Sequence, residues 1–281
     1  MTVDWIGYKL SASFGERWGK LMDIDSATVQ NPVPTTVLPL TSALNGQEYR
    51  LFVSLPASYE NAQQSYPVLY VLDGNALFSL VRQIAEIVSI ASPRPVPELI
   101  IVGVGYPVPT YADTLQLRGF DLTYEQFTPP PGHTYPWGKT GGGMTFIKVL
   151  TEEIMPMIDR QYRTDRADQG LIGCSRGGGF AHRAIYLCPG VFSRLIVIDG
   201  WDEEAEKYAL QQGQTAPTRH LFIGFASSPS NADDEARLNS HIEAVKASGV
   251  NARGHIFDGE DHFSVVPMVI SRGLREVYAA P

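Results

Sequence analysis

Two hydrophobic periods alternate along most of the chain. Residues 35–40 and 48–55 alternate apolar with polar side chains, which predicts two antiparallel strands, and Asn45-Gly46 between them suits a tight turn. The runs 67–72 and 99–104 are continuously apolar, as expected of strands that are buried on both faces. The pattern therefore predicts a hairpin that leads into a buried sheet.

Segments with helical spacing separate the apolar runs. Helices are expected over 76–92 and from Phe146 to Met157, where Pro156 is predicted to kink the chain. The later expected elements are strand 195–198, helix 203–211, strand 220–225, helix 233–247, strand 254–257 and a last helix ending near Ala279. Such alternation implies a mostly parallel, twisted sheet with helices on both faces. We predict one α/β domain over 1–281, with residues 1–33 as an N-terminal extension.

Residues 106–143 break this rhythm. The segment is rich in proline, glycine and aromatic residues and shows no clear periodicity. A long stretch without regular structure inside a compact domain is usually functional or disordered. The aromatic content favours order, so we predict an irregular wall over the active site.

Composition excludes several classes of protein. The chain has 281 residues, 44% of them hydrophobic, and a formal net charge of −8 with scattered basic residues, which argues against nucleic-acid binding. It contains no run of 18 apolar residues and no visible signal peptide. We therefore expect a cytoplasmic protein that does not span a membrane. The two cysteines suggest neither a disulfide framework nor a zinc site.

The stretch from Leu171 to Phe180 carries the main chemical signal. Its centre is Gly-x-Ser-x-Gly around Ser175, the nucleophile-elbow pattern of a sharp strand-to-helix turn. An apolar run precedes it and apolar residues at helical spacing follow it, as that turn requires. Cys174, beside the serine, is interpreted as a small buried side chain rather than as the nucleophile.

A serine hydroxyl needs a neighbouring base. His262 is the best candidate, because it follows the last predicted strand, in the chain order of this fold. His133, in the irregular segment, is the second candidate, and a packing role is expected for His182. The remaining histidines are assigned to structure or solvent: His220, His241 and His255.

Five ordered stretches resemble a known family. They are Tyr66–Gly74, Arg118–Thr123, Phe146–Tyr162, Gly173–Gly178 and Gly259–Ser264. Together they resemble the putative-esterase family of α/β-hydrolases, typified by enterobactin and ferric-siderophore esterases and by esterase D. The resemblance implies an α/β-hydrolase fold, Ser175 as nucleophile and His262 as general base. It also implies an oxyanion hole made by the backbone N–H groups of Arg176 and Asn75.

The acid of the catalytic triad is where the sequence departs from the family. A carboxylate is expected soon after the strand that ends at Phe225, but the next residues are Ala226 to Asn231. Asp234 shares helical spacing with apolar residues and is the predicted acid, although a carboxylate in a first helical turn also suits the helix dipole. Asp199, Asp202 and a Ser-His dyad remain alternatives.

We predict a serine esterase that works through an acyl-enzyme on an aryl, lactone or siderophore-like ester, without metal or cofactor. An acyltransferase and a catalytically silent binding protein are the alternatives. Arg176 either binds an anionic substrate group or pairs with a buried acid. The expected substrate-binding residues are Arg118, Tyr135 and Trp137.

Overall fold

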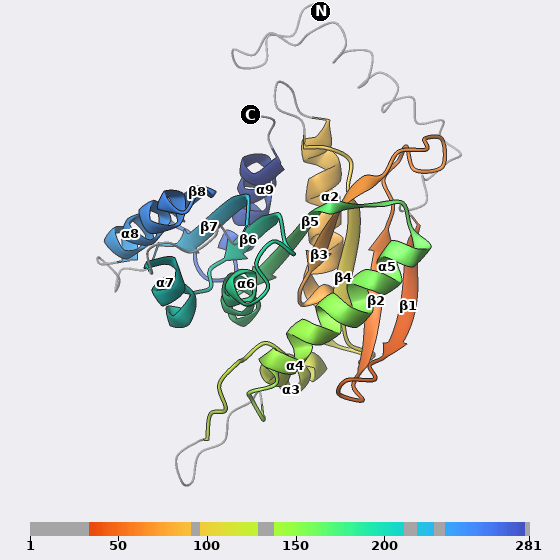
Figure 1. The fold of residues 1–281 in the computed structure, drawn as a ribbon, viewed down its shortest axis with the longest axis horizontal. Helices are drawn as coiled ribbons and strands as arrows, with labels where there is room; N and C mark the ends of the chain where they lie inside the picture. The colour runs from red at the N-terminus through yellow and green to blue at the C-terminus, as the bar shows by residue number, and fades with distance from the viewer. Residues whose placement is uncertain (1–33, 91–95, 129–137, 211–217, 228–233, 279–281) are drawn as a thin grey trace, which may run out of the picture. The chain divides into compact units, whose positions relative to one another are not determined.

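The strands form one sheet in the order β1-β2-β4-β3-β5-β6-β7-β8 in the computed structural model, which describes residues 34–90, 96–128, 138–210, 218–227 and 234–278 (Figure 1). Their bounds are β1 Thr35–Thr41, β2 Glu48–Ser54, β3 Tyr66–Val71, β4 Ile100–Gly105, β5 Thr164–Cys174, β6 Arg194–Ile198, β7 His220–Ala226 and β8 Asn251–Phe257. β2 pairs antiparallel with β1 and β4, and all the other pairs are parallel. This is the predicted α/β-hydrolase arrangement.

Helices cover both faces of the sheet. They are α2 Gly74–Ser89, α3 Tyr111–Asp121, α4 Gly143–Lys148, α5 Met155–Gln161, α6 Arg176–Leu187, α7 Glu203–Leu210, α8 Asp234–Ala247 and α9 Val265–Tyr278, with a π-helical turn at Val149–Ile154 between α4 and α5. α2 and α9 pack on one face, while α5, α6 and α8 pack on the other (Figure 1). The connections between β3 and β8 thus alternate with parallel strands, as the hydrophobic periods predicted.

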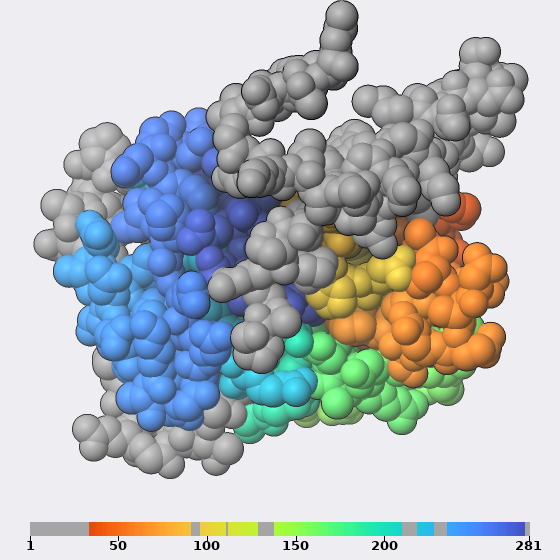
Figure 2. Space-filling view, turned by 90° about the horizontal axis from the view of Figure 1, so that it is seen from above, coloured from red at the N-terminus to blue at the C-terminus, as the bar shows by residue number. Residues whose placement is uncertain are grey.

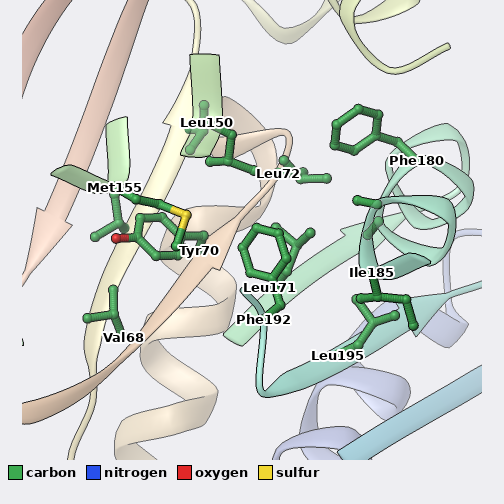
Figure 3. Packing of buried hydrophobic residues seen from close by; sticks show 14 of the residues in the cluster. Val68, Tyr70, Leu72, Leu150, Met155, Leu171, Phe180, Ile185, Phe192 and Leu195 are labelled. Atoms are coloured by element: carbon green, nitrogen blue, oxygen red, sulfur yellow. The ribbon is translucent and has the colours of Figure 1, made fainter. Parts of the chain in front are cut away.

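Alternation along the strands builds two cores. Leu171 and Leu195 belong to the core under α6, whereas their neighbours Ile172 and Ile196 belong to the core under α2 and α9. Figure 3 shows Leu171 and Leu195 in the first core with Phe180 and Ile185 of α6. Each of these side chains is fully buried or nearly so, which stabilises the fold by about 1.5–3 kcal/mol per side chain.

The segment 106–143 is more regular than expected, because it contains α3. Thr110 starts this helix with a capping box, in which its hydroxyl accepts from the Asp113 N–H and the Asp113 carboxylate accepts from the Thr110 N–H. The sequence concealed the helix because its inward face is polar: Thr114, Arg118 and Asp121 are buried. Apolar spacing therefore could not reveal it. The irregularity expected at Pro156 takes the form of the π-helical turn just before it.

Residues Thr35–Pro281 form one compact unit. The β1–β2 hairpin and the pair α8–β8 lie at opposite ends of its sheet (Figure 2). The predicted extension 1–33 lies outside the described residues, so the single domain over 1–281 stays a prediction. Among the described helices, none combines the length and the apolar character needed to cross a bilayer.

Candidate active site

The predicted nucleophile stands between a strand and a helix. β5 ends at Cys174, α6 begins at Arg176, and Ser175 between them has φ 56° and ψ −120°, a strained conformation for a residue with a side chain. Glycines make this turn possible. A Cβ at Gly173 would lie 2.2 Å from the Gly177 carbonyl oxygen, and one at Gly200 would lie 2.3 Å from the Ser175 carbonyl oxygen. The elbow is therefore sterically closed to larger residues.

Gly173→Ala is expected to lower the free energy of unfolding by about 2 kcal/mol or more, because the new methyl group can be accommodated only if the backbone moves. The measurement is urea unfolding. Gly46→Asn is the matched control, since Gly46 has φ 71° with nothing near its missing Cβ, and asparagine tolerates that conformation. Equal stability of Gly173→Ala and wild type would contradict the close packing of the elbow.

The predicted oxyanion donors both lie at helix starts. Arg176 is the first residue of α6 and Asn75 the second residue of α2, and N–H groups in a first turn have no acceptor within their own helix. These helices follow β5 and β3, which are neighbours in the sheet. The Asn75 side chain bonds to the backbone of Tyr106 through Oδ1 (2.7 Å) and Nδ2 (3.0 Å), which fixes it to the end of β4. Their role as oxyanion donors stays a prediction.

A buried ion pair supports the start of α2. The Arg118 guanidinium donates to both oxygens of Asp73, at 2.6 and 2.8 Å, and both residues are buried. Asp73 Oδ2 also lies 3.0 Å from where a Cβ on Gly177 would be, so the carboxylate touches the elbow helix. Arg118 therefore binds a carboxylate of the protein, and its predicted contact with substrate stays a prediction.

The charges of Arg118 and Asp73 also act on Arg176. Burial, and then repulsion from Arg118, lower the pKa of Arg176, while Asp73 opposes them. Two arginines and two aspartates therefore lie near the elbow, namely Arg118, Arg176, Asp73 and Asp199.

A short hydrogen-bonded loop positions His262. Asp261 accepts from the backbone N–H groups of Phe263 and Ser264, both at 2.8 Å, and so stabilises a turn just before α9. The Gly259 N–H donates to the Ser227 hydroxyl at 3.0 Å, which joins this loop to the one after β7. His262 thus stands on a fixed turn at the carboxyl edge of the sheet.

His262 meets a carboxylate from β6. Its Nδ1 lies in hydrogen-bond contact with Asp199 Oδ2. Asp199 is the residue directly after β6 and has φ 42°. Its N–H donates to the Gly224 carbonyl at 2.8 Å, and its Oδ1 accepts from the Ala226 N–H at 3.0 Å. Because these bonds to β7 fix the carboxylate, its other oxygen is directed at the imidazole.

The structure thus brings together His262 and Asp199, which the sequence offered as an alternative. Asp234 is the first residue of α8, but its side chain lies outside the described part of the chain, so its catalytic role stays a prediction. Asp202, the other alternative, forms a bidentate pair with Arg183 at 2.7 and 2.6 Å. The remaining candidates in the irregular segment lie outside the described residues: His133, Tyr135 and Trp137. The sequence signal for Asp199 was an Asp-Gly pair directly after a buried strand.

The Cys174 thiol is expected to be a poor nucleophile. Burial raises the pKa of its thiol to about 12, and the negative charge of Asp73 acts in the same direction. The thiolate is the nucleophilic form of cysteine. At neutral pH this thiol therefore stays protonated, in agreement with its interpretation as a small packing residue.

Two further histidines form a buried pair between α6 and α8. The Nε2 atoms of His182 and His241 lie 2.9 Å apart, and neither Nδ1 has a hydrogen-bond partner among the described residues. Burial lowers the pKa of both, that of His241 to about 4, and His241 further lowers that of His182 by repulsion. Both rings are therefore neutral at pH 7 and serve packing, as expected for His182.

Acid is expected to destabilise the fold through this pair. The unfolded chain takes up a proton near the ordinary pKa of 6.5, whereas the folded His241 does so near 4. The contribution of neutral His241 to the free energy of unfolding is thus complete above pH 6.5 and is lost as the pH falls toward 4. The difference corresponds to about 3 kcal/mol. Urea unfolding at pH 7.5 and 4.5 measures it.

The double variant His182→Leu/His241→Leu should lose much of the stability difference between the two pH values. His255→Gln is the control, since His255 is exposed and should leave the difference unchanged. An equal pH dependence in wild type and double variant would show that other groups cause the acid sensitivity.

Comparisons with known proteins identify relatives of this chain. The ferri-bacillibactin esterase BesA of Bacillus subtilis is 28% identical over 262 residues, which cover 86% of this chain and 89% of BesA. A siderophore triacetylfusarinine C esterase of Aspergillus fumigatus is 28% identical over 271 residues, which cover 82% of this chain and 88% of that protein.

Solved structures and a family model give the same answer. The crystal structure of the BES protein from Bacillus cereus matches with a TM-score of 0.74 at 27% identity, over 90% of this chain and 100% of that one. The predictions of an α/β-hydrolase fold and of an esterase are therefore confirmed. The family model described as "Putative esterase" matches residues 41–263, and the chain belongs to that family.

Proposed function

We propose that this chain is a serine esterase in which Ser175, His262 and Asp199 form the catalytic triad. The observation that carries the proposal is the contact between His262 Nδ1 and Asp199 Oδ2, at the same sheet edge as the elbow. A carboxylate on Nδ1 holds the tautomer in which Nε2 is free to accept a proton. The imidazole is thereby prepared to act as a base toward a serine.

The reaction then follows in two halves. Nε2 of His262 takes the Ser175 hydroxyl proton while the serine oxygen attacks the ester carbonyl. The carbonyl–alkoxy bond breaks, and the leaving alkoxide receives the proton from His262, which leaves an acyl-enzyme. In the second half water attacks the acyl group, its proton passes through His262 to Ser175, and the carboxylic acid departs. Asp199 stays ionised and stabilises the imidazolium in both halves.

The proposed substrates are ester-linked siderophores or closely similar esters. The names of two relatives support this, since one is a ferri-bacillibactin esterase and the other a triacetylfusarinine C esterase. The position of Arg176 also supports it. Arg176 directly follows Ser175, and a guanidinium group suits a carboxylate or another anionic group close to the ester.

The test uses purified protein with a fluorophosphonate probe and with siderophores that contain ester bonds, both iron-loaded and iron-free. We expect one labelled residue, Ser175, and acid and alcohol products by mass spectrometry. The Ser175→Ala variant is the control for both readouts. If Ser175 is labelled and simple aryl esters are hydrolysed but no siderophore is, the proposed substrate class is wrong. The assignment as a serine esterase would then still hold.

A competing alcohol in the same assay separates hydrolysis from acyl transfer. We expect free acid to dominate when glycerol is added. Predominant transfer to the alcohol would instead favour an acyltransferase on the same residues. If neither label nor product appears, the chain is a silent member of the family.

A further inference from the structure

A cavity of about 410 Å³ lies beside α3. It is bounded by Gln47 of the β1–β2 turn, by α3 and by Lys139. Ser175, His262 and Asp199 are not among the described residues that line it. Its volume falls within the range of small-molecule sites, so the cavity is large enough for a ligand of its own.

A buried carboxylate forms part of its wall. Asp121 is only 2% exposed, and the hydroxyls of Tyr49 and Tyr106 donate to its Oδ2 at 2.9 and 3.1 Å. Asn45 donates in turn to the Tyr49 hydroxyl at 2.9 Å. Among the described residues, no hydrogen bond ends at Asp121 Oδ1. One oxygen is thus fixed by a hydrogen-bond network, and the other remains for a group in the cavity.

The described residues provide no cation that pairs with this carboxylate. No lysine or arginine of the described part forms an ion pair with Asp121. Burial raises its pKa to about 6, against the pull of the two tyrosine hydroxyls, so it is mostly ionised at pH 7.5. A buried charge without a partner is costly, and a cation placed against it recovers part of that cost.

The rest of the wall supplies what a zwitterion needs. Lys139 is exposed at the cavity and has no ion-pair partner among the described residues, so it can bind an anion. Gln116 adds an amide, and Leu117 and Phe120 give an apolar surface on α3. The wall of one cavity thus contains a positive group, a negative group and apolar side chains.

We propose that this cavity is a second ligand site, apart from the Ser175 centre, for a small zwitterion with an apolar body, namely a free aromatic or aliphatic amino acid. Asp121 binds its ammonium group and Lys139 its carboxylate. Leu117 and Phe120 contact its side chain. The proposal does not depend on the esterase reaction, because none of these residues belongs to the proposed triad.

Three probes of nearly equal size test it: L-phenylalanine, phenethylamine, which lacks the carboxylate, and 3-phenylpropanoate, which lacks the ammonium group. Binding is measured by calorimetry at pH 7.5 on the full chain with Ser175→Ala, so that ester turnover does not interfere. We expect L-phenylalanine to bind at least about tenfold more tightly than either analogue, the equivalent of one charge-assisted contact.

Variants assign the two contacts. Asp121→Asn should weaken L-phenylalanine about tenfold or more, and Lys139→Met should do the same while leaving phenethylamine unchanged. Lys148→Met is the control, because Lys148 is an exposed lysine of α4 that does not line the cavity. If Asp121→Asn does not fold, Lys139→Met and the probe series still decide. Equal binding of the three probes, no binding, or an equal loss with Lys148→Met would overturn the proposal.

Discussion

Ser175→Ala is expected to reduce ester hydrolysis by about 10⁵–10⁶-fold in kcat while leaving the unfolding midpoint unchanged. The substitution removes only the hydroxyl group, whose oxygen is the atom that would carry the acyl group. Alanine keeps the Cβ that the strained turn already accommodates at φ 56°. Initial rates on an activated aryl ester and urea unfolding measure the two effects.

Cys174→Ala is the matched control, because this thiol is the other nucleophilic group at the elbow. Its pKa of about 12 predicts turnover close to wild type in that variant. Near-wild-type hydrolysis by Ser175→Ala together with a large loss in Cys174→Ala would transfer the nucleophile to the cysteine.

Asp199→Asn is expected to lower kcat by about 10²–10⁴-fold with little change in KM. An amide can donate to the ring and thereby favour the tautomer whose Nε2 already carries a proton. The substitution keeps the size of the side chain, and the amide oxygen can still accept from the Ala226 N–H. Stability should therefore change less than activity. Steady-state kinetics and urea unfolding of the same preparation separate the two.

Asp234→Asn and Asp202→Asn are the controls for this assignment. Asp202 is held by Arg183, so its loss should affect stability rather than turnover. For Asp234 we expect at most about 0.3–1 kcal/mol of stability from the helix dipole, with kcat unchanged. A larger loss of kcat in Asp234→Asn than in Asp199→Asn would restore the sequence-based choice. If neither variant loses kcat, the site operates as a Ser-His dyad.

A carboxylate after β6 can serve a histidine after β8 because of the sheet between them. β7 separates these strands, and Asp199 bonds to β7 at both its N–H and its Oδ1. The His262 loop is tied to the segment after β7 through Ser227. The two side chains are therefore set against a common strand, which compensates for the greater distance along the sheet.

The sequence alone indicated the alternation of strands and helices outside the segment 106–143, and two of the three proposed catalytic residues. Parallel strands that are buried on both faces appear in the sequence as unbroken apolar runs. Ser175 directly follows β5, and His262 lies in the loop after β8, both at motif positions. The apolar runs and the motif around Ser175 depend only on neighbouring residues along the chain. Local periodicity and steric rules are sufficient to read them.

Only the tertiary structure decided which carboxylate meets His262 and what the buried polar residues of α3 do. Helical spacing can turn Asp234 toward a core, but it carries no information about the distance between Asp234 and the loop that contains His262. Asp199 and His262 are 63 residues apart, and their contact depends on strand order and on the backbone turn at φ 42°. Arg118 and Asp121 likewise acquire their roles from Asp73 and the two tyrosines. Such long-range contacts produce no periodic pattern in the sequence, because they depend on how separate elements pack together.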